Sequence, residues 1–575
     1  DQGNKNGYDI GSNQFPDGVL ILDNYHSSQF NSDLILNFQK DIGKDLNFSL
    51  MLGHNYFTNY FKEEFSQGNN LSLPNFFDMS NASSFFSVER TQQKRTMAFY
   101  GQAQLEYKNM LYLTLTGRNE TSSTLPPQNN TFFYPSASLG FVFTDALGLS
   151  SNNIFPYGKI RLSYAQVGKD ALPQALNTYY VSTLVNDGFT TGLIYPFNGV
   201  GGFSLGSIIS VIGNPNLKPE NTNSYEAGLD LAFFQNRIGF SGTYYYEKTT
   251  DQIFTVAIPY TTGFSAVILN AGEIRNEGVE LTLNTTPIKA KSGFKWDLDF
   301  NWSMNRNKVV ALAPGIDNLF ISGFQNGGIY AVQGMPYGII YGNAYVRSDN
   351  GQLIINDDPN DPGYGKPIGG SVNKPIGDIN PDWFGSVVST FSYKGWSLGC
   401  QLDVREGGDI WNGTKGALEY FGRAGTTENR GKTGTFSGLA GHLDVNGNVV
   451  HYAADGTTEV SGPGSAVTQQ STLDQYYYQF LGSSFIGPAE STVEDGSFVR
   501  IRELSLSYAV PQKWLDNIHI TQLSITAFAN NAFLWTKYDG VDPETSLIGP
   551  ANGQGLDYFN NPSIKSYGIR LNIGL

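Results

Sequence analysis

The residues that come nearest to a reactive centre are those of the pentapeptide GFSLG, Gly202–Gly206. A nucleophilic serine in a Gly-x-Ser-x-Gly motif needs a strand–turn–helix context and a histidine and acid partner. Here the pentapeptide lies in a glycine-rich stretch without a helical pattern, which indicates a loop. The segment GTTENRGKT, residues 425–433, is one residue too long for a phosphate-binding loop and is also interpreted as a loop. We therefore expect no enzymatic activity.

Metal ligation and redox chemistry find equally little support. The five histidines show no ligand spacing, so no metal site is expected. The stretches NDDPNDPGYG (356–365) and DVNGN (444–448) do not fit a twelve-residue EF-hand loop, and they are typical of Asx-turns. A loop Ca²⁺ is the alternative for them; otherwise no cofactor is expected. The single cysteine, Cys400, excludes an internal disulfide framework and falls on an apolar, lipid-facing pattern.

Aromatic side chains in the segments expected to be loops are the candidates for binding a ligand. Aromatic faces next to polar groups suit both sugar rings and peptide side chains. Packing within the loops, or contact with a partner protein, would explain the same residues. The candidates are Tyr179, Tyr180, Tyr195, Tyr330, Trp411, Tyr420, Phe421 and Tyr477.

These loops connect segments in which apolar and polar residues alternate, the pattern of β-strands. About fifteen strands are predicted, near 33–41, 45–56, 96–107, 110–120, 132–144, 157–168, 222–234, 237–249, 276–287, 293–306, 384–393, 395–406, 497–509, 519–529 and 564–575.

The alternation assigns each strand one apolar and one polar face. Trp396, Leu398 and Leu402, for example, oppose Gln401 and Asp403. In SFVRIRELSLSY the parity changes between Arg502 and Glu503, which predicts a β-bulge. By the same rule the side chains expected to face the polar interior are Arg161, Asp299, Asn301, Asp403, Arg405 and Arg570.

The connections alternate between short and long. Tight turns such as DIGKD and SYKGWS are separated by long loops near 57–95, 121–131, 169–221, 250–275, 307–383, 407–496 and 530–563. Short turns at one end and long loops at the other are typical of a transmembrane antiparallel β-barrel. Such a barrel must close, because lipid cannot satisfy backbone polar groups. The alternatives are a soluble β-sandwich, propeller or β-helix.

Composition favours the membrane barrel. The chain has 575 residues with 14% aromatics and 66 glycines, and only 15% of its residues are charged, against about 25% in soluble domains. Its net charge of −15 argues against nucleic acid as a partner, because phosphates require a basic surface. No apolar run reaches the roughly 20 residues of a spanning helix.

Several ordered segments resemble the SusC/RagA family of TonB-dependent outer-membrane transporters. They include GNPNLKPENTNSYEAGLDLAFFQNRIGFSGTYYYEKTTDQIF, TTGFSAVILNAGEIRNEGVELTLNTTPI, DGSFVRIRELSLSY, NNAFLWTKYDGVDPE and the terminal SIKSYGIRLNIGL. The terminal Leu575 departs from the aromatic residue that usually ends such barrels. The resemblance is specific for the family and says little about the cargo.

The resemblance implies a 22-stranded barrel, an N-terminal plug and a SusD-like surface lipoprotein as a lid. Fifteen strands fall short of that number, so we expect residues 33–575 to be a C-terminal part of the barrel, with residues 1–32 a loop. The plug and the N-terminal region that contacts TonB are expected to lie outside this chain. The outer-membrane lipid and a dimer of transporter–lipoprotein pairs are the other implied partners.

The function implied by the resemblance is import of a large nutrient, such as an oligosaccharide or a peptide, across the outer membrane. A passive porin-like channel and a scaffold in a larger envelope complex are the alternatives among barrels. A soluble β-rich glycan-binding protein or hydrolase is the alternative outside them.

Overall fold

The description of the fold rests on most of the chain. The computed structural model describes residues 2–12, 15–178, 184–185, 193–194, 211–259, 262, 264–324, 327–516, 520–549 and 553–574.

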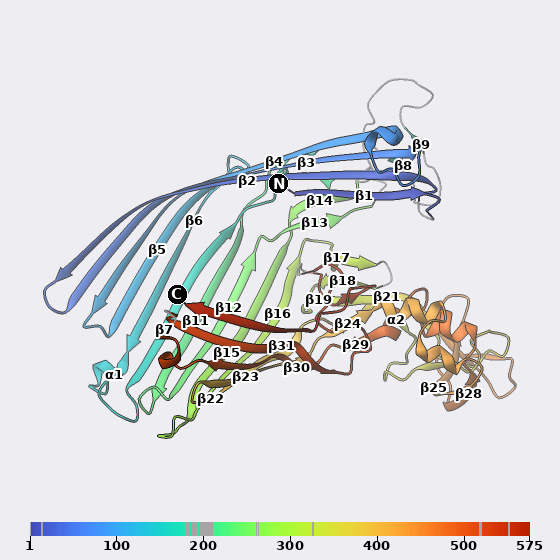
Figure 1. Cartoon of the computed structure of the whole chain (residues 1–575). Helices are drawn as coiled ribbons and strands as arrows, with labels where there is room; N and C mark the ends of the chain where they lie inside the picture. Colours follow the sequence, from blue (N-terminus) through green and yellow to red (C-terminus); the bar gives the residue numbers. More distant parts are fainter. Residues whose placement is uncertain are drawn as a thin grey trace. The chain divides into compact units, whose positions relative to one another are not determined.

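A 16-stranded sheet dominates these residues, with its strands in the order in which they occur along the chain (Figure 1). Neighbouring strands of this sheet pair in the antiparallel direction, as predicted. Its strands are β1 (Gln2–Ile10), β2 (Asp17–Ile42), β3 (Leu46–Leu71), β4 (Ala82–Tyr107), β5 (Leu111–Ser122), β6 (Thr131–Val142), β7 (Tyr157–Lys169), β11 (Glu220–Phe233), β12 (Ile238–Thr250), β15 (Gly272–Lys289), β16 (Lys295–Leu312), β22 (Pro381–Tyr393), β23 (Trp396–Gly407), β30 (Phe498–Ala509), β31 (Gln522–Thr536) and β33 (Ser566–Gly574).

All fifteen predicted strands are present, and β1 is the sixteenth. Two expected loops are wrong. Most of 57–95 belongs to β3 and β4, and 1–32 holds β1 and the first part of β2, which runs through residue 32 without a break. The strands β2, β3 and β4 are 26 residues long. Their outer parts carry polar residues on both faces, so backbone pairing continues where the apolar alternation that reveals a strand has ended.

Apolar side chains stand exposed on one face of the strands. In β33, Tyr567, Ile569 and Leu571 are 72%, 79% and 55% exposed. In β30, Leu504 and Leu506 are exposed on the same alternation. A surface this apolar is unsuited to water and suits contact with lipid or with another apolar surface.

The short turns lie where the sequence predicts them. The turn between β22 and β23 contains Lys394 and Gly395 with φ angles of 46° and 88°. Two positive φ values in a two-residue connection match the right-handed twist of the paired strands. The tightness of this hairpin therefore follows from the Lys-Gly pair.

The chain forms two compact units, which are described separately. The first comprises Asp1–Val142, Arg161–Glu226 and Glu247–Glu273, and the second Phe143–Ile160, Ala227–Tyr246 and Ile274–Leu575. In the first unit, Leu125, Ala171, Ala175 and Leu217 form a buried cluster among the loops. A small sheet of β10 (Val211–Ile212), β14 (Ala266–Asn270) and β13 (Ile253–Ala257) supports it, and β8 (Leu184–Val185) pairs with β9 (Leu193–Ile194).

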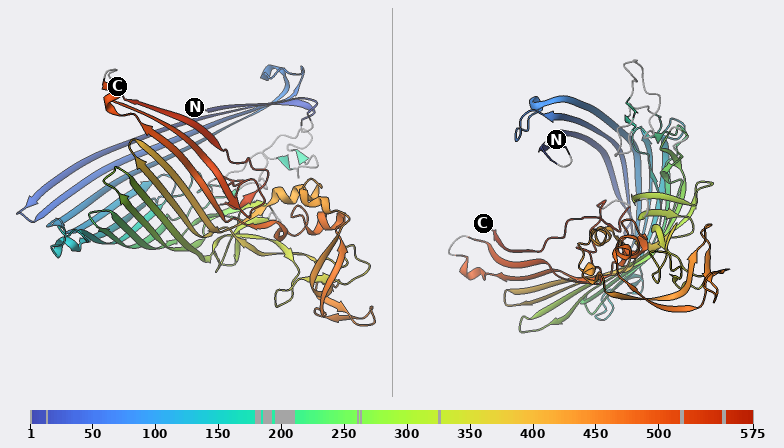
Figure 2. Two further views of the ribbon diagram at one scale, coloured as in Figure 1. Left: turned by 60° about the horizontal axis from the view of Figure 1, so that its bottom comes forward. Right: turned by 90° about the vertical axis from the view of Figure 1, so that its right-hand side faces the viewer.

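The long connections of the second unit fold into a loop layer beyond one end of its sheet strands (Figure 2). One sheet of the layer contains β17 (Asn318–Phe324), β18 (Gly327–Val332), β19 (Tyr337–Tyr345) and β21 (Gly369–Asp378). Another contains β20 (Ile354–Asn356), β25 (Thr433–Leu443), β26 (Val449–Tyr452) and β27 (Glu459–Ser461), with β28 (Ala466–Thr472) paired to β25. The third contains β29 (Val493–Asp495), β24 (Asp409–Asn412) and β32 (Leu556–Asp557).

The loop layer has a hydrophobic core of its own. Ile329, Ile340, Trp411, Ala489 and Leu556 come from three different connections and are all buried in one cluster. Packing between connections that are distant in sequence gives these loops the properties of a folded body rather than of a flexible linker.

In the part of the chain that the structure describes, helices are few and short. They are α1 (Phe143–Ala146), α2 (Gly413–Tyr420), and the short turns η1 (Met79–Asn81), η4 (Gly425–Asn429), η5 (Tyr477–Leu481), η6 (Ala489–Thr492) and η7 (Gln512–Trp514). Within the described ranges, no helix combines the length and the apolar character needed to cross a membrane.

The two faces of β30 should differ in their tolerance of charge. Leu506→Arg places a cation on the exposed apolar face, so we expect a loss of about 2–4 kcal/mol if the site lies near the bilayer midplane. Ser505→Arg, one residue earlier on the polar face, is the matched control and should assemble normally. Folding yield in liposomes, followed by the heat-dependent gel shift of barrels, measures the difference; equal yields would contradict the assignment of faces.

Candidate functional site: a polar network below the loop layer

The predicted β-bulge in β30 is confirmed, and it organises the polar face. Gln401 pairs with Glu503 and Leu402 with Ile501, so Arg502 is the extra residue opposite β23. The ladder with β31 is interrupted at the same point. Because the bulge changes the parity of the strand, Arg502 remains on the side of Asp403 while Leu504 returns to the apolar face.

Arg502 bridges the sheet and the connection between β31 and β33. Its Nε donates to Asp403 at 2.7 Å, and its two terminal nitrogens donate to Glu544 at 2.9 and 2.7 Å. Asp403 also accepts hydrogen bonds from Ser386 and Gln401 at 2.9 and 3.0 Å. The fork of the guanidinium suits two carboxylates at fixed positions, which ties the 537–565 connection to β23 and β30.

A second arginine forms a buried ion pair beside the first. The Arg500 and Asp542 side chains are 2% and 1% exposed, and their closest nitrogen and oxygen are 2.6 Å apart. The Nε of Arg500 lies 3.2 Å from Glu544 without hydrogen-bond geometry. Burial opposes ionisation of Asp542, but hydrogen bonds from Arg500 and Ser563 outweigh it and hold the pKa of this carboxyl below its usual range.

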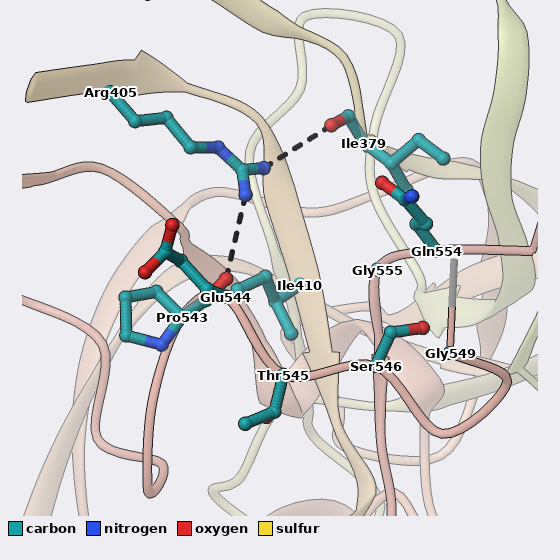
Figure 3. A pocket seen from close by; sticks show the side chains of 10 residues that line it. All are labelled: Ile379, Arg405, Ile410, Pro543, Glu544, Thr545, Ser546, Gly549, Gln554 and Gly555. Carbon is teal, nitrogen blue, oxygen red and sulfur yellow. Dashed lines mark hydrogen bonds between the residues drawn. The ribbon is translucent and has the colours of Figure 1, made fainter. Parts of the chain in front are cut away.

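Arg405 differs from these two arginines, because its hydrogen bonds go to backbone carbonyls. It donates to Gly407 at 3.3 Å, Ile379 at 3.3 Å and Pro543 at 3.4 Å. Figure 3 shows its guanidinium between the last two. A cavity of about 360 Å³ adjoins this group; its lining residues are Ile379, Arg405, Ile410, Pro543, Glu544, Thr545, Ser546, Gly549, Gln554 and Gly555.

The remaining residues predicted for the polar face do not join this network. Asp299 and Asn301 belong to a ladder of hydrogen bonds with β15, in which Asn284 donates to Asp299 and Thr282 to Asn301 at 2.7 and 2.9 Å. Their assignment to a barrel lumen stays a prediction. Arg161 lies between Ile160 and Leu162, whose side chains are exposed on the opposite, apolar face of β7. The Arg570 guanidinium lies 5.3 Å from the centre of the Phe528 ring.

Sequence reasoning missed Arg500, Asp542 and Glu544. The bulge identified Arg502 as unusual, but nothing local indicates which loop carboxylates reach it. The acidic segment VDPE, residues 541–544, contributed to the family resemblance and to no other inference. The arginines that pair with it lie about 40 residues earlier in the chain, so no local pattern connects them.

The predicted cargo aromatics have different environments. Trp411 is 4% exposed in the core of the loop layer, so its expected contact with cargo is corrected to packing. Tyr330 packs between Phe320 and Tyr341, at ring distances of 5.3 and 5.1 Å. Tyr477 packs against Phe436 and Tyr478 at 5.5 and 5.1 Å. Tyr179, Tyr180, Tyr195 and GFSLG lie outside the described residues.

Tyr420 and Phe421 retain the character expected of a contact surface. They lie at the end of α2, where both rings approach Phe485, at 4.9 and 5.7 Å. The Phe421 side chain is 64% exposed and Phe485 is 40% exposed. This aromatic patch, defined by Tyr420, Phe421 and Phe485, offers open ring faces to a ligand or a protein.

The Asp/Asn-rich stretches form the turns that the sequence predicts. The Asn356, Asp361 and Asp444 side chains each accept from the backbone N–H group two residues later. Asp444 also accepts from the backbone N–H of Asn448, four residues later. Among the described residues, no group of three or more His, Cys, Asp or Glu side chains could hold a metal ion. The expectation that the protein needs no cofactor stays a prediction. The segment 425–433 begins with the short helical turn η4.

One histidine in the loop layer lies between two carboxylates. The Nδ1 of His442 is 2.7 Å from Asp357 and its Nε2 is 3.4 Å from Glu459. Its ring lies tilted against the Tyr452 ring, with the two ring centres 4.4 Å apart. Burial alone lowers the pKa of His442, but the two carboxylates outweigh it and raise this pKa above its ordinary value. Through these two contacts the His442 ring links β25 to β27 and to the turn at Asp357.

Comparison with known proteins identifies the family. The family model "TonB dependent receptor-like, beta-barrel" matches residues 1–330, more than half of the chain. The chain belongs to the TonB-dependent receptor family. "TonB-dependent receptor P3" of Formosa agariphila is 26% identical over 509 residues, which cover 83% of this chain and 45% of that receptor. "TonB-dependent receptor SusC" of Bacteroides thetaiotaomicron is 25% identical, over 78% of this chain and 41% of SusC.

Solved structures agree with the fold. "Structure of the RagAB peptide transporter" matches with a TM-score of 0.70 and 19% identity, over 97% of this chain and 56% of that chain. The predicted resemblance to SusC and RagA is confirmed, and the protein is an outer-membrane β-barrel protein of the TonB-dependent receptor family. The chain spans about half the length of the curated relatives that it matches.

The buried Arg500–Asp542 pair should be far more sensitive to loss of one partner than of both. Arg500→Met leaves a buried carboxylate unpaired, so we expect a loss of about 3–5 kcal/mol from the free energy of unfolding. In the double variant Arg500→Met/Asp542→Leu most of this loss should be recovered. Denaturant titration in detergent, with cleavage in 537–565 as a local readout, measures both. Additive losses would show that the two side chains act independently.

The stability of the loop layer should depend on pH through His442. The folded-state pKa is raised above the unfolded value of about 6.5, so its contribution is fully present below pH 6.5 and is lost as pH rises through the raised pKa. Hydrogen exchange of residues 442–461 between pH 5.5 and 9 should show this loss. His442→Gln should remove the pH-dependent part; an unchanged profile in this variant would assign it to another group.

Proposed function

We propose that the chain is the barrel part of a SusC-like importer, which takes up a large nutrient such as an oligosaccharide or a peptide. A SusD-like lipoprotein would cover the loop layer, and energy would reach the transporter through TonB. Membership of the TonB-dependent receptor family is the observation that carries the proposal. The description of RagAB as a peptide transporter and the likeness to SusC support it.

The loop layer supports capture of a large cargo. Its connections pack around a shared core, so their exposed side chains are held in fixed positions. The aromatic patch at the end of α2 presents ring faces at this layer. Rigid, preorganised contacts bind with a smaller loss of conformational entropy than mobile ones.

The polar network supports passage of a hydrated cargo along the interior. Arg500 and Arg502 fasten the 537–565 connection to the polar face through Asp542 and Glu544. A fastened connection can stay in place while an inner plug moves. The ladder of Thr282, Asn284, Asp299 and Asn301 continues the polar lining along β15 and β16. In this proposal no bond of the cargo is broken.

Purification of the complete receptor from native outer membranes, combined with uptake assays, tests the proposal. We expect a SusD-like lipoprotein to co-purify and fluorescent oligosaccharide or peptide to enter only when the proton-motive force is present. Entry that continues after its collapse would show a passive channel. A stable complex with other envelope proteins and no uptake would show a scaffold.

The aromatic patch should contribute to capture of the cargo. Phe421→Ala removes an exposed ring, so we expect cargo affinity to fall about 2- to 10-fold, the range of a single aromatic contact. Isothermal titration with the imported cargo measures this change. Trp514→Ala is the control, because Trp514 is an exposed aromatic in the connection between β30 and β31. An equal loss in both variants would contradict a specific role for Phe421.

A further inference from the structure

We propose that the cavity beside Arg405 is a subsite for a carboxylate group of the cargo. The inference rests on the proposed import function and names the chemistry that one part of the path would recognise. The cavity has a volume of about 360 Å³, within the range of small-ligand pockets.

The first argument is the distribution of charge partners. In the described part of the chain, the ion pairs formed by Asp403, Asp542 and Glu544 involve Arg500 and Arg502. No ion pair of Arg405 with a described carboxylate lies within 4.0 Å; its hydrogen bonds go to neutral carbonyls at 3.3–3.4 Å. Glu544, Asp495 and Asp409 attract the Arg405 guanidinium from a greater distance, but none of them forms an ion pair with it. Its direct contacts are therefore all neutral, and a charge-assisted hydrogen bond to a carboxylate of the cargo would be stronger than any of them.

The second argument is the balance of donors and acceptors in the cavity wall. Arg405 offers only donors, while Ser546, Thr545 and Gln554 can donate as well. The Ser546 hydroxyl is buried and has no hydrogen-bond partner. An oxyanion would accept from the N–H groups of Arg405 that no carbonyl occupies, and the Ser546 hydroxyl, which is closed to solvent, would join by rotating toward it. An apolar ligand would leave both groups unsatisfied.

Glu544 also lines the cavity, so its negative charge must be considered. One of its oxygens accepts from Arg502 at 2.7 Å, and the other accepts from Arg502 at 2.9 Å and lies 3.2 Å from Arg500. Two cations therefore compensate this carboxylate. In Figure 3 its oxygens point away from Ser546 and Gln554, so it leaves the donors on that side of the cavity open.

A carboxylate can belong to a uronic-acid residue of an oligosaccharide or to the C-terminus of a peptide, and the experiment separates these sources. Isothermal titration of the complete receptor in detergent would use four probes: trigalacturonic acid and its methyl ester, and a tripeptide with a free and with an amidated C-terminus. The measurement needs neither TonB nor energised import, so its failure is distinguishable from failure of the proposed function.

We expect one charged probe to bind about 10- to 100-fold more tightly than its neutral partner, the effect of one charge-assisted hydrogen-bonded group. Arg405→Gln should reduce the affinity for that probe to the level of the neutral one, without affecting the neutral probe. Arg405→Lys should lie between, because an ammonium keeps the charge but loses the fork. Ser546→Ala should cause a smaller loss, in a variant that leaves every ion pair in place.

Arg306→Gln is the matched control, because Arg306 is a half-exposed arginine paired with Asp382 at 2.9 Å. Its affinity for all probes should equal that of the unaltered receptor. Melting temperatures of the variants show that the fold is retained. Equal binding of charged and neutral probes, absence of binding by both charged probes, or retention of the charge preference in Arg405→Gln would each overturn the proposal.

Discussion

In a bilayer every backbone N–H and C=O group needs a partner within the protein, and the rest of this structure depends on that constraint. Strand pairing satisfies it, and pairing forces side chains to alternate between the two faces of the sheet. One face can then be apolar for lipid, as in β33, while the other gathers groups that lipid would exclude. The buried Arg500–Asp542 pair belongs to this second face, where it is surrounded by protein.

The loop layer satisfies its backbone polar groups in a different way from the membrane-spanning strands. Connections of this length would carry many unsatisfied polar groups and a large entropy of disorder if they remained extended. Here they pair into three small sheets and share the core around Trp411 and Leu556. The arginines of β30 then attach the layer to the sheet through Asp542 and Glu544. Recognition chemistry can therefore be placed on connections without loss of positional order.

The sequence was sufficient for features that depend on neighbouring residues. The alternation located fifteen strands, the parity change located the bulge at Arg502, and the Lys394-Gly395 pair located a tight turn. It failed for β1 and for the outer parts of β2–β4, where both faces carry polar residues and pairing leaves no periodic trace. It also failed for Trp411 and for the carboxylates around Arg500, because their surroundings are set by connections that return from distant parts of the chain.

The bulge in β30 has a consequence for how this strand can change over evolutionary time. The alternation of side chains between the two faces shifts by one position at Arg502. Before Arg502 the odd-numbered residues, such as Val499, are on the apolar face; after it the even-numbered residues, such as Leu504, are. Deleting Arg502 would restore a regular ladder with β23 and leave both halves of the strand facing as they do now, with Arg500 inward and Val499 outward. What such a deletion would remove is the bridge that Arg502 forms from Asp403 to Glu544. The bulge is therefore the point at which this strand can lose a residue without exchanging its two faces, at the expense of the attachment of the 537–565 connection.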